Sequence, residues 1–316
     1  MIGVCIVTYN QEDYIAKAID SVLLQKDCPE GVLIYIGNDC STDRTTDICN
    51  SYAALYPDRI RLFNNPHNLG LVENTLSILQ KIQNDNCEYI AMLDGDDYWC
   101  DELKLYKQAA FLDSHPDYGY IQGWGYLLTD SGLKKPKEYV PPIGNVFDKM
   151  GSFPIGGSSA FFRCSLLNFI DFDDFKKQGF LSLDYVMYVI FSAHTLFGFL
   201  PEYLFVWRRN VSSVSNPQNK EKQIAYLQND RAMWQYLGRL FPERFFFDEA
   251  SWEKYYNKKV FQIAFRFKDY QLAHQVLPVL KREQRSPSLK MKMKMICAMN
   301  KVLFLFFTSL HSFIQQ

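Results

Sequence analysis

Residues 88–99 read Glu88-Tyr89-Ile90-Ala91-Met92-Leu93-Asp94-Gly95-Asp96-Asp97-Tyr98-Trp99. The first half is mostly apolar and predicts a buried strand, which runs directly into three carboxylates around a glycine. Asp94 and Asp96 are two residues apart, so on an extended backbone their side chains leave the same face. Neighbouring carboxylates favour a cation between them, and oxygen ligands suit Mg²⁺ or Mn²⁺, which usually also bind substrate phosphates. The segment therefore predicts a strand-end site for a metal and a diphosphate, with an acidic turn chosen only for its geometry as the alternative.

The composition is that of a globular protein with one large domain, or one domain plus an extension. The chain has 316 residues and a net charge of −1, so no global field attracts nucleic acid, and we expect no nucleic-acid partner. The cysteines are scattered without a secretory signal or a zinc-like spacing, which favours a reducing cytoplasm. The apolar run at residues 302–314 is shorter than the roughly 20 residues that a spanning helix needs. We expect a cytoplasmic protein, at most peripheral on the inner face of the plasma membrane.

The first hundred residues alternate between strand and helix patterns. Strands are expected at residues 2–7, 32–36, 59–63 and 89–93, and helices at 13–24, after Ser41 as N-cap, and at 72–83. This alternation predicts an α/β fold with a parallel sheet. Polar residues follow each strand, at Thr8, Asp39, Asn68 and Asp94. Because ligands of such sheets bind at the carboxyl ends of the strands, we expect these side chains to converge on one edge.

The remainder predicts two different regions. A helix at 101–114 is followed by a β-rich insertion at 118–162, a small-residue loop and strand at 156–163, a helix at 184–194 and a strand at 200–207. Helical patterns then cover 223–241, 252–267 and 271–281. The predicted domains are therefore residues 1–215, which carry the site, and a helical extension at residues 216–316.

Four motifs in this order and spacing resemble those of the family 2 glycosyltransferases. They are Val7-Thr8-Tyr9-Asn10 after the first strand, Asn38-Asp39-Cys40-Ser41-Thr42-Asp43 after the second, Asn68-Leu69-Gly70 followed by Asn74, and the segment 93–99 after the fourth. The resemblance covers residues 1–215. Within the family, this part of the chain is similar to the bacterial enzymes of polysaccharide and cell-envelope biosynthesis. It implies the type-A glycosyltransferase fold, with a mostly parallel central sheet flanked by helices; the helical extension lies outside it.

The resemblance also implies an activity. It is the inverting transfer of a sugar from a nucleotide-diphosphate donor, a UDP-sugar in the first instance, to a hydroxyl of a glycan or lipid-linked acceptor. Mn²⁺ or Mg²⁺ would assist by neutralising the leaving diphosphate. Asp96 matches the metal-binding carboxylate, and Asp94 would face the ribose or share the metal. Asp97 would position these two carboxylates without binding the metal itself, or it would cap a helix.

The same resemblance assigns the donor site. Thr8 and Tyr9 would form a wall beside the base, and Asp39 would accept the N3–H of a uracil or similar base; the alternative for Asp39 is a cap of the next helix. Asn74 completes the motif set. Arg208 would contact the diphosphate, with a surface ion pair as the alternative. Asn210 stands where the family usually has a histidine, so the resemblance assigns it no metal or phosphate contact.

Asp184 matches the catalytic base of the family, which starts a helix before the last core strand. An acceptor hydroxyl is a poor nucleophile and needs a base opposite the leaving group. Leu183 stands where the family often has an acidic residue. The structural alternative is that Asp184 only caps its helix.

The C-terminal region combines basic and apolar residues. The basic ones are Lys281, Arg282, Arg285, Lys290, Lys292 and Lys294. On one continuous helix, Met291, Met295, Ala298, Val302, Leu305 and Ser309 would share an apolar face. Such a helix can lie on a membrane surface, or it can pack on its own domain or on a second subunit of a homo-oligomer.

Other functions remain as alternatives. A nucleotidyltransferase would need a glycine-rich, basic loop after the first strand, and a haloacid-dehalogenase-like phosphatase would need its acidic pair there. A non-catalytic nucleotide-sugar-binding protein of the same fold would keep the donor residues without transfer.

Overall fold

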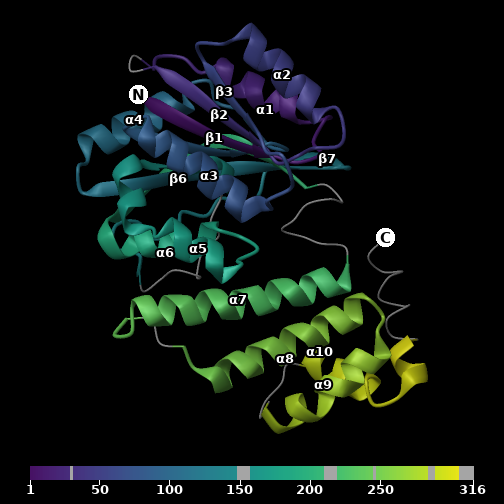
Figure 1. Cartoon of the computed structure of the whole chain (residues 1–316). Helices are drawn as coiled ribbons and strands as arrows, with labels where there is room; N and C mark the ends of the chain where they lie inside the picture. Colours follow the sequence, from purple (N-terminus) through teal and green to yellow (C-terminus); the bar gives the residue numbers. More distant parts are fainter. Residues whose placement is uncertain (29–30, 148–156, 210–218, 245–246, 284–288, 306–316) are drawn as a thin grey trace. The chain divides into compact units, whose positions relative to one another are not determined.

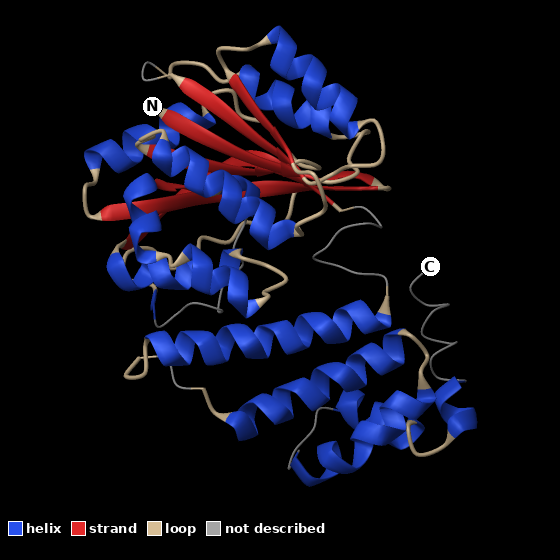
Figure 2. Cartoon of the chain, in the orientation of Figure 1, coloured by secondary structure: helices blue, strands red, loops and turns tan. Residues whose placement is uncertain are grey.

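The computed structural model describes residues 1–28, 31–147, 157–209, 219–244, 247–283 and 289–305. The chain divides into two compact units, Met1–Asn210 and Val211–Gln316, here called the N-terminal and C-terminal units. The N-terminal unit contains the sheet, and the C-terminal unit is helical (Figure 1, Figure 2). Asn210, Arg285 and Ser309, which the sequence had singled out, lie outside the described residues.

One mixed sheet organises the N-terminal unit. Its described strands are β1 (Ile2–Thr8), β2 (Val32–Asn38), β3 (Ile60–Asn64), β4 (Tyr89–Asp94), β5 (Tyr98–Trp99), β6 (Tyr118–Thr129), β7 (Gly132–Lys134), β8 (Phe161–Arg163) and β9 (Leu196–Arg208). The order is β3-β2-β1-β4-β8-β6-β9-β5, with β7 added to β6. The first four strands are parallel, while β8 is antiparallel to both of its neighbours. The α/β fold with a mostly parallel core is therefore confirmed.

Helices cover both faces of this sheet (Figure 1). Apolar side chains of α1 (Ile15–Leu23), α2 (Thr45–Leu55) and α4 (Lys104–Ser114) form one core with alternate residues of β1, β2 and β4. The opposite face carries α3 (Leu71–Asn84). It packs closely because two strand residues have no side chain: a Cβ at Gly3 would lie 2.4 Å from Ile82 Cγ2. A Cβ at Gly37 would lie 2.7 Å from Ile78 Cγ1.

Two further helices follow in the N-terminal unit. They are α5 (Phe172–Gln178), capped by Asp171, and α6 (Asp184–His194). The α6 helix spans the residues expected for it and packs on β6, where Tyr120 stacks on Tyr188 with ring centroids 5.7 Å apart. This contact places the start of α6 near the centre of the sheet.

The structure corrects three local expectations. The α2 helix begins at Thr45, so Ser41 is not its N-cap; the Ser41 hydroxyl instead donates to Asn38 Oδ1 at 2.6 Å. The insertion after α4 contains one long strand, β6, with short partners, because residues 135–143 pair with no strand. The last strand, β9, begins at Leu196, earlier than the apolar run alone indicated.

The C-terminal unit consists of a helical bundle in its described part. Its helices are α7 (Lys220–Leu240), α8 (Glu249–Arg266), α9 (Tyr270–Glu283) and α10 (Leu289–Cys297). Asp248 caps α8 by accepting from the backbone N–H groups of Ala250 and Ser251. A separate apolar core, which includes Phe261 and Leu277, holds the bundle together. The expected helical extension is therefore confirmed.

The C-terminal helix is not continuous, contrary to the expectation. It ends at Cys297, turns at residues 298–300 and resumes at 301–305. Met291, Met295 and Ala298 of the predicted face are buried in the core of the unit, but Val302 is 74% exposed because the turn rotates it away. In the part of the chain described here, no helix is both long and apolar enough to cross a membrane.

Candidate active site

The carboxyl ends of β1, β2 and β4 meet at one edge of the sheet. Thr8 is paired in register with Asn38 of β2, and Val7 is paired with Asp94 of β4. The polar residues that follow these strands are therefore neighbours, as the sequence predicted. Gly95 allows this close approach, because a Cβ there would lie 2.3 Å from Gln11 Oε1 and 3.0 Å from Val7 O.

The loops after β1 and β2 are joined by hydrogen bonds. Asn10, in the left-handed region with φ 52°, accepts the backbone N–H of Thr42 at 2.8 Å. The backbone N–H of Gln11 donates to Thr45 Oγ1 at 2.8 Å. Thr8 is buried and its hydroxyl donates to Gln11, whereas Tyr9 is 46% exposed. Of the two residues expected beside the base, Tyr9 is therefore accessible to a ligand and Thr8 is not.

Asp39 is buried and fixes the loop before α3. Its Oδ1 accepts from Leu69 N at 2.8 Å and Asn65 Nδ2 at 2.9 Å, and its Oδ2 accepts from Gly70 N at 2.8 Å. This carboxylate therefore does not cap the α2 helix that follows it. It ties the end of β2 to the Asn65–Gly70 segment, and a free position on Oδ2 remains compatible with a further donor.

Asn74 is also buried, and both ends of its amide are in use. Its Nδ2 donates to Gly37 O at 2.9 Å, and its Oδ1 accepts from Asn65 Nδ2 at 3.0 Å. Asn74 thus acts on the backbone of β2 and on the Asn65 side chain that also binds Asp39. Asn74 therefore helps to fix the loops at the carboxyl end of β2.

Four carboxylates surround the end of β4. Asp94, Asp96 and Asp97 come from the motif, and Asp184 arrives from the first residue of α6. A Cβ placed on Gly157 would lie 3.0 Å from Asp184 Oδ2 and 3.6 Å from Asp94 Oδ2. Only a glycine at this position leaves the space between the two carboxylates open.

The pKa values of these carboxyls are raised. Burial, followed by the charges of Asp97, Asp184 and Asp96, raises the pKa of Asp94 well above its ordinary value. Burial raises the pKa of Asp184 to about 6. Asp94 nevertheless keeps solvent-accessible surface. Asp94 is therefore reachable by solvent while other carboxylates crowd it, so a cation would find excess negative charge there.

Asp97 serves a different purpose from its neighbours. Its Oδ2 accepts from Ser158 Oγ at 2.6 Å, and its Oδ1 accepts from the backbone N–H of Arg208 at 2.8 Å. Burial and the charge of Asp96 raise its pKa to about 7, against the effect of these hydrogen bonds. Asp97 therefore joins three segments that are distant in sequence, consistent with the supporting role expected of it.

Arg208 lies over the acidic cluster at the end of β9. Its Nε donates to the backbone carbonyl of Asp96 at 2.8 Å. The guanidinium lies 4.7 Å from the ring centroid of Tyr14 and 5.6 Å from that of Tyr98. This packing holds a positive charge beside the motif, where it can meet a diphosphate.

The 3-10 turn η2 (Gly157–Ser159) contributes residues that the sequence did not identify as functional. Ser158 Oγ accepts the backbone N–H of Asp94 at 3.2 Å and donates to Asp97. From the sequence, the run Gly157-Ser158-Ser159-Ala160 predicts only a loop that leads into a strand. Its small residues were the available signal, because they allow close approach to a buried cluster.

A divalent cation fits this site only together with a substrate. Within the described residues, no group of three His, Cys, Asp or Glu side chains could hold a metal ion by itself. Mg²⁺ is usually held by one or two carboxylates plus substrate phosphates and water. Asp94 and Asp96 supply that number of ligands, and the burial and neighbouring carboxylates that raise the pKa of Asp94 are conditions that a bound cation would offset. The donor set therefore fits a metal that binds with a diphosphate.

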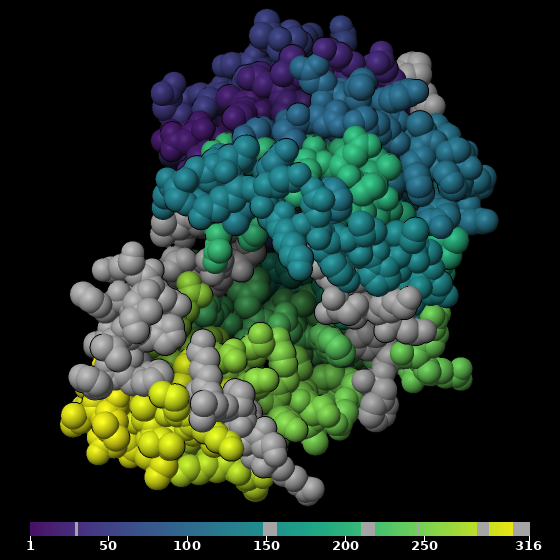
Figure 3. Space-filling model, turned by 180° about the vertical axis from the view of Figure 1, so that it is seen from behind, coloured from purple at the N-terminus to yellow at the C-terminus, as the bar shows by residue number. Residues whose placement is uncertain are grey.

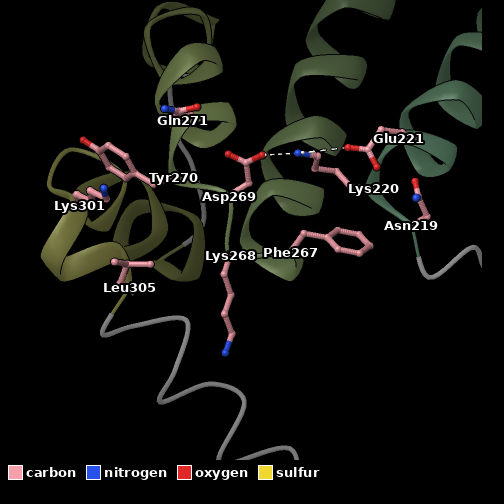
Figure 4. Close-up of a pocket in the computed structure, with 10 residues that line it drawn as sticks. All are labelled: Asn219, Lys220, Glu221, Phe267, Lys268, Asp269, Tyr270, Gln271, Lys301 and Leu305. Carbon is pink, nitrogen blue, oxygen red and sulfur yellow. Dashed lines mark hydrogen bonds and ion pairs between the residues drawn. The ribbon is translucent and has the colours of Figure 1, made fainter.

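A large pocket of the described chain lies elsewhere. It has a volume of about 600 Å³ and is formed in the C-terminal unit, between the start of α7 and the α8–α9 turn (Figure 4). Asp269 forms an ion pair with Lys220 at 2.6 Å on one side of it, and Lys268 points away from that pair. Its carboxylates do not converge as those at the end of β4 do, and Asp269 is already paired with Lys220, so we assign the site to the sheet edge.

Comparison with known proteins identifies the family. The model of glycosyl transferase family 2 matches residues 3–175, more than half of the chain. The uncharacterized protein Rv1520 of Mycobacterium tuberculosis is 30% identical over 214 residues, which are 66% of this chain and 58% of that protein. The chain thus spans less than two thirds of the length of this relative.

Solved structures share the fold. Mannosyltransferase PcManGT from Pyrobaculum calidifontis, in complex with GDP-Man and Mn²⁺, has a TM-score of 0.56 and 15% identity, covering 98% of this chain and 86% of that one. TarS 1-349 from S. aureus, in complex with UDP-GlcNAc, has a TM-score of 0.53 and 15% identity, covering 99% of this chain and 91% of that one. The type-A glycosyltransferase fold expected from the motifs is confirmed, and the chain belongs to glycosyl transferase family 2.

Proposed function

We propose that the protein transfers a sugar, with inversion, from a nucleotide-diphosphate donor to an acceptor hydroxyl. The observation that carries this proposal is the approach of Asp94 and Asp184 to one position, since a Cβ on Gly157 would lie 3.0 Å from Asp184 Oδ2 and 3.6 Å from Asp94 Oδ2. One carboxylate belongs to the motif that would bind the diphosphate and its metal, and the other is the first residue of α6. An inverting displacement needs such a pair, because the leaving group and the attacking hydroxyl lie on opposite faces of the sugar.

The donor side is proposed to use the edge formed by β1, β2 and β4. Tyr9 would lie beside the base, Asp39 would accept its N–H, and Arg208 would contact the diphosphate. Mn²⁺ or Mg²⁺ on Asp96 and Asp94, when bound, would supply charge stabilisation of the leaving diphosphate. The complexes of PcManGT with GDP-Man and Mn²⁺ and of TarS with UDP-GlcNAc support a nucleotide-sugar donor as the class.

Asp184 is proposed to take the proton of the acceptor hydroxyl. A pKa of about 6 leaves it ionised at neutral pH and makes it a stronger base than an ordinary aspartate. It is the first residue of α6, and the N-cap position belongs to Leu183, which makes no side-chain cap. These observations favour a chemical role over a capping role.

The acceptor is proposed to be a glycan or a lipid-linked sugar. On β6, Trp124 and Tyr126 share the face of Tyr120, on which α6 packs. Tyr203 of β9 lies 5.4 Å from the Trp124 ring and 4.4 Å from the Tyr126 ring. These rings are half-buried, on the face that also carries α6, and the strands that bear them belong to the surface seen from behind (Figure 3). Aromatic faces of this kind suit a pyranose ring.

A membrane surface is also a proposed partner of the C-terminal unit, on a set of residues that shares only Val302 and Leu305 with the face expected from the sequence. Met291 and Met295 are buried, but the outer side of this region exposes Met293, Ile296, Met299, Val302, Leu303 and Leu305. Lys292 lies on the same helix and is exposed. Basic and apolar residues together favour an anionic lipid surface.

A panel of UDP-, GDP-, dTDP- and CDP-sugars in thermal-shift assays, with and without Mn²⁺, tests the donor proposal. We expect one nucleotide class to raise the melting temperature only with metal. NMR of the product then tests inversion at the anomeric carbon. If the protein binds a donor but neither hydrolyses nor transfers it, the alternative of a nucleotide-sugar-binding protein is favoured.

A further inference from the structure

Lys104 is fully buried within the N-terminal unit, at 0% exposure. It lies at the start of α4, and its Nζ donates to Gln108 Oε1 at 2.7 Å. The same Nζ lies 4.1 Å from the ring centroid of Trp99. Burial lowers its pKa well below the ordinary value. Lysine is almost never fully buried without a partner, so a neutral amide and an aromatic ring as its neighbours require an explanation.

Gln108 and Trp99 lead from this lysine to the η2 turn. Gln108 Nε2 donates to Ser159 O at 2.9 Å, and Trp99 Nε1 donates to Ser158 O at 2.9 Å. Both consecutive carbonyls of the turn are thus held by side chains that touch Lys104. The η2 turn also carries Ser158, whose Oγ accepts the backbone N–H of Asp94 and donates to the carboxylate of Asp97.

The lysine also fixes the orientation of the amide. Because Lys104 Nζ donates to it, the Gln108 amide presents Oε1 to the lysine. The Nε2 group is then left to face Ser159 O. An apolar side chain at position 104 would allow the amide to rotate and place its oxygen against the carbonyl, which repels it.

We propose that Lys104 is a positioning residue: through Gln108 and Trp99 it holds the Gly157–Ser159 turn against the end of β4 and so sets the geometry of the Asp94 and Asp97 carboxylates. The inference rests on the proposed metal and donor site at these carboxylates. It concerns residues outside the four motifs, and Lys104 itself touches no substrate.

The first test requires no ligand. The indole N–H groups of the tryptophans are recorded by ¹⁵N NMR, with the Trp99 signal assigned from Trp99→Phe. We expect exchange of the Trp99 indole proton with D₂O to be at least about tenfold faster in Lys104→Met than in wild type, because the ring loses the Nζ group that packs on it and Gln108 loses the donor that orients its amide toward the turn. Lys107→Met is the matched control, since Lys107 lies on the same helix but pairs with Asp101 at the surface. Equal exchange in the wild-type and Lys104→Met proteins overturns the proposal.

The second test separates positioning from stability. In Lys104→Met/Gln108→Leu both polar partners become apolar, so the melting temperature should recover relative to Lys104→Met. Ser159 O loses the Gln108 amide as a donor, so Mn²⁺ binding in the presence of nucleoside diphosphate, followed by electron paramagnetic resonance, should be at least about tenfold weaker than in Lys107→Met. Recovery of both properties would reduce Lys104 to a stability role. If wild type itself binds no Mn²⁺, the proposed function fails, while the NMR test still decides the contact network.

Discussion

The backbone N–H of Arg208 donates to Oδ1 of Asp97 at 2.8 Å, and this bond joins the end of β9 to the motif after β4. Because Ser158 occupies Oδ2 of the same carboxylate, Asp97 is committed to protein partners. Asp96 contributes its carbonyl to Arg208 Nε. Adjacent carboxylates of one motif therefore have different tasks, and substitutions should separate them.

Donor binding and turnover should depend on a divalent metal at Asp96. We expect EDTA to abolish both, with recovery on addition of Mn²⁺ or Mg²⁺. Asp96→Ala should lose more turnover than Asp97→Ala, whose main effect should be a lower melting temperature. Asp58→Ala, in an exposed loop before β3, serves as the control. Full activity of Asp96→Ala in EDTA would contradict a metal role.

Asp39→Ala should weaken binding of the nucleoside diphosphate itself, with or without the sugar. A hydrogen bond to a charged group contributes roughly 1.5–3 kcal/mol, which corresponds to about ten- to a hundredfold in affinity. The variant should also be less stable, because Leu69 N, Gly70 N and Asn65 lose their acceptor. Titration calorimetry measures the affinity.

Asp43→Ala separates the two effects of Asp39. Asp43 also binds backbone N–H groups, those of Glu12 and Thr45, in the same loop region. It should lose stability without a comparable loss of affinity. If the two variants bind the nucleotide equally well, Asp39 has only a structural role.

Asp184→Asn should bind donor and metal normally and lose transfer by roughly 10²–10⁴-fold, the usual worth of general base catalysis. For the wild type, kcat/KM should rise with pH through about 6, where the Asp184 carboxyl ionises. A variant that retains transfer near the wild-type rate would move the base to Asp173 or Asp174, the next carboxylates to test.

The same substitution should stabilise the fold at neutral pH. The pKa of Asp184 is about 6 in the folded protein against an ordinary 3.8, so the folded state binds the proton more tightly. Its contribution to stability is therefore present below about pH 4 and is lost as pH rises through 6. The shift corresponds to roughly 3 kcal/mol. Since Asp184 is only half-buried and asparagine stays polar, we expect about 1–2 kcal/mol.

Unfolding of Asp184→Asn and wild type at pH 5 and pH 7.5 measures this effect. The variant should gain more at the higher pH. Asp173→Asn, exposed on α5, is the matched control and should show no such difference. A destabilised Asp184→Asn at pH 7.5 would mean that the ionised carboxylate has a stabilising partner in the folded state.

Ile296→Asp/Val302→Asp should weaken pelleting with phosphatidylserine vesicles at low salt and leave the fold intact. Both side chains are exposed, so the changes remove apolar contact with lipid without opening the core. Met295→Asp, by contrast, should unfold the C-terminal unit, because Met295 belongs to its core. If the wild-type protein does not bind the vesicles, the membrane proposal is wrong, and contact with a second subunit becomes the alternative for this surface.

The sequence alone determined the alternation of strands and helices, the sheet edge at which Thr8, Asp39 and Asp94 meet, and the family. These features rest on local periodicity and on short motifs, which act within one element. The start of α6 at Asp184 was also correct. Missed boundaries, such as α2 starting at Thr45, arose because Ser41 found a side-chain partner in Asn38.

Only the tertiary structure decided which distant residues complete the site. Ser158 is 61 residues away from Asp97 in the sequence and donates to its carboxylate. Lys104 is buried in contact with Gln108 and Trp99. In the tail, the turn after Cys297 decided which apolar residues are buried. Such outcomes depend on long-range packing and on which polar groups find partners, and a linear pattern carries neither.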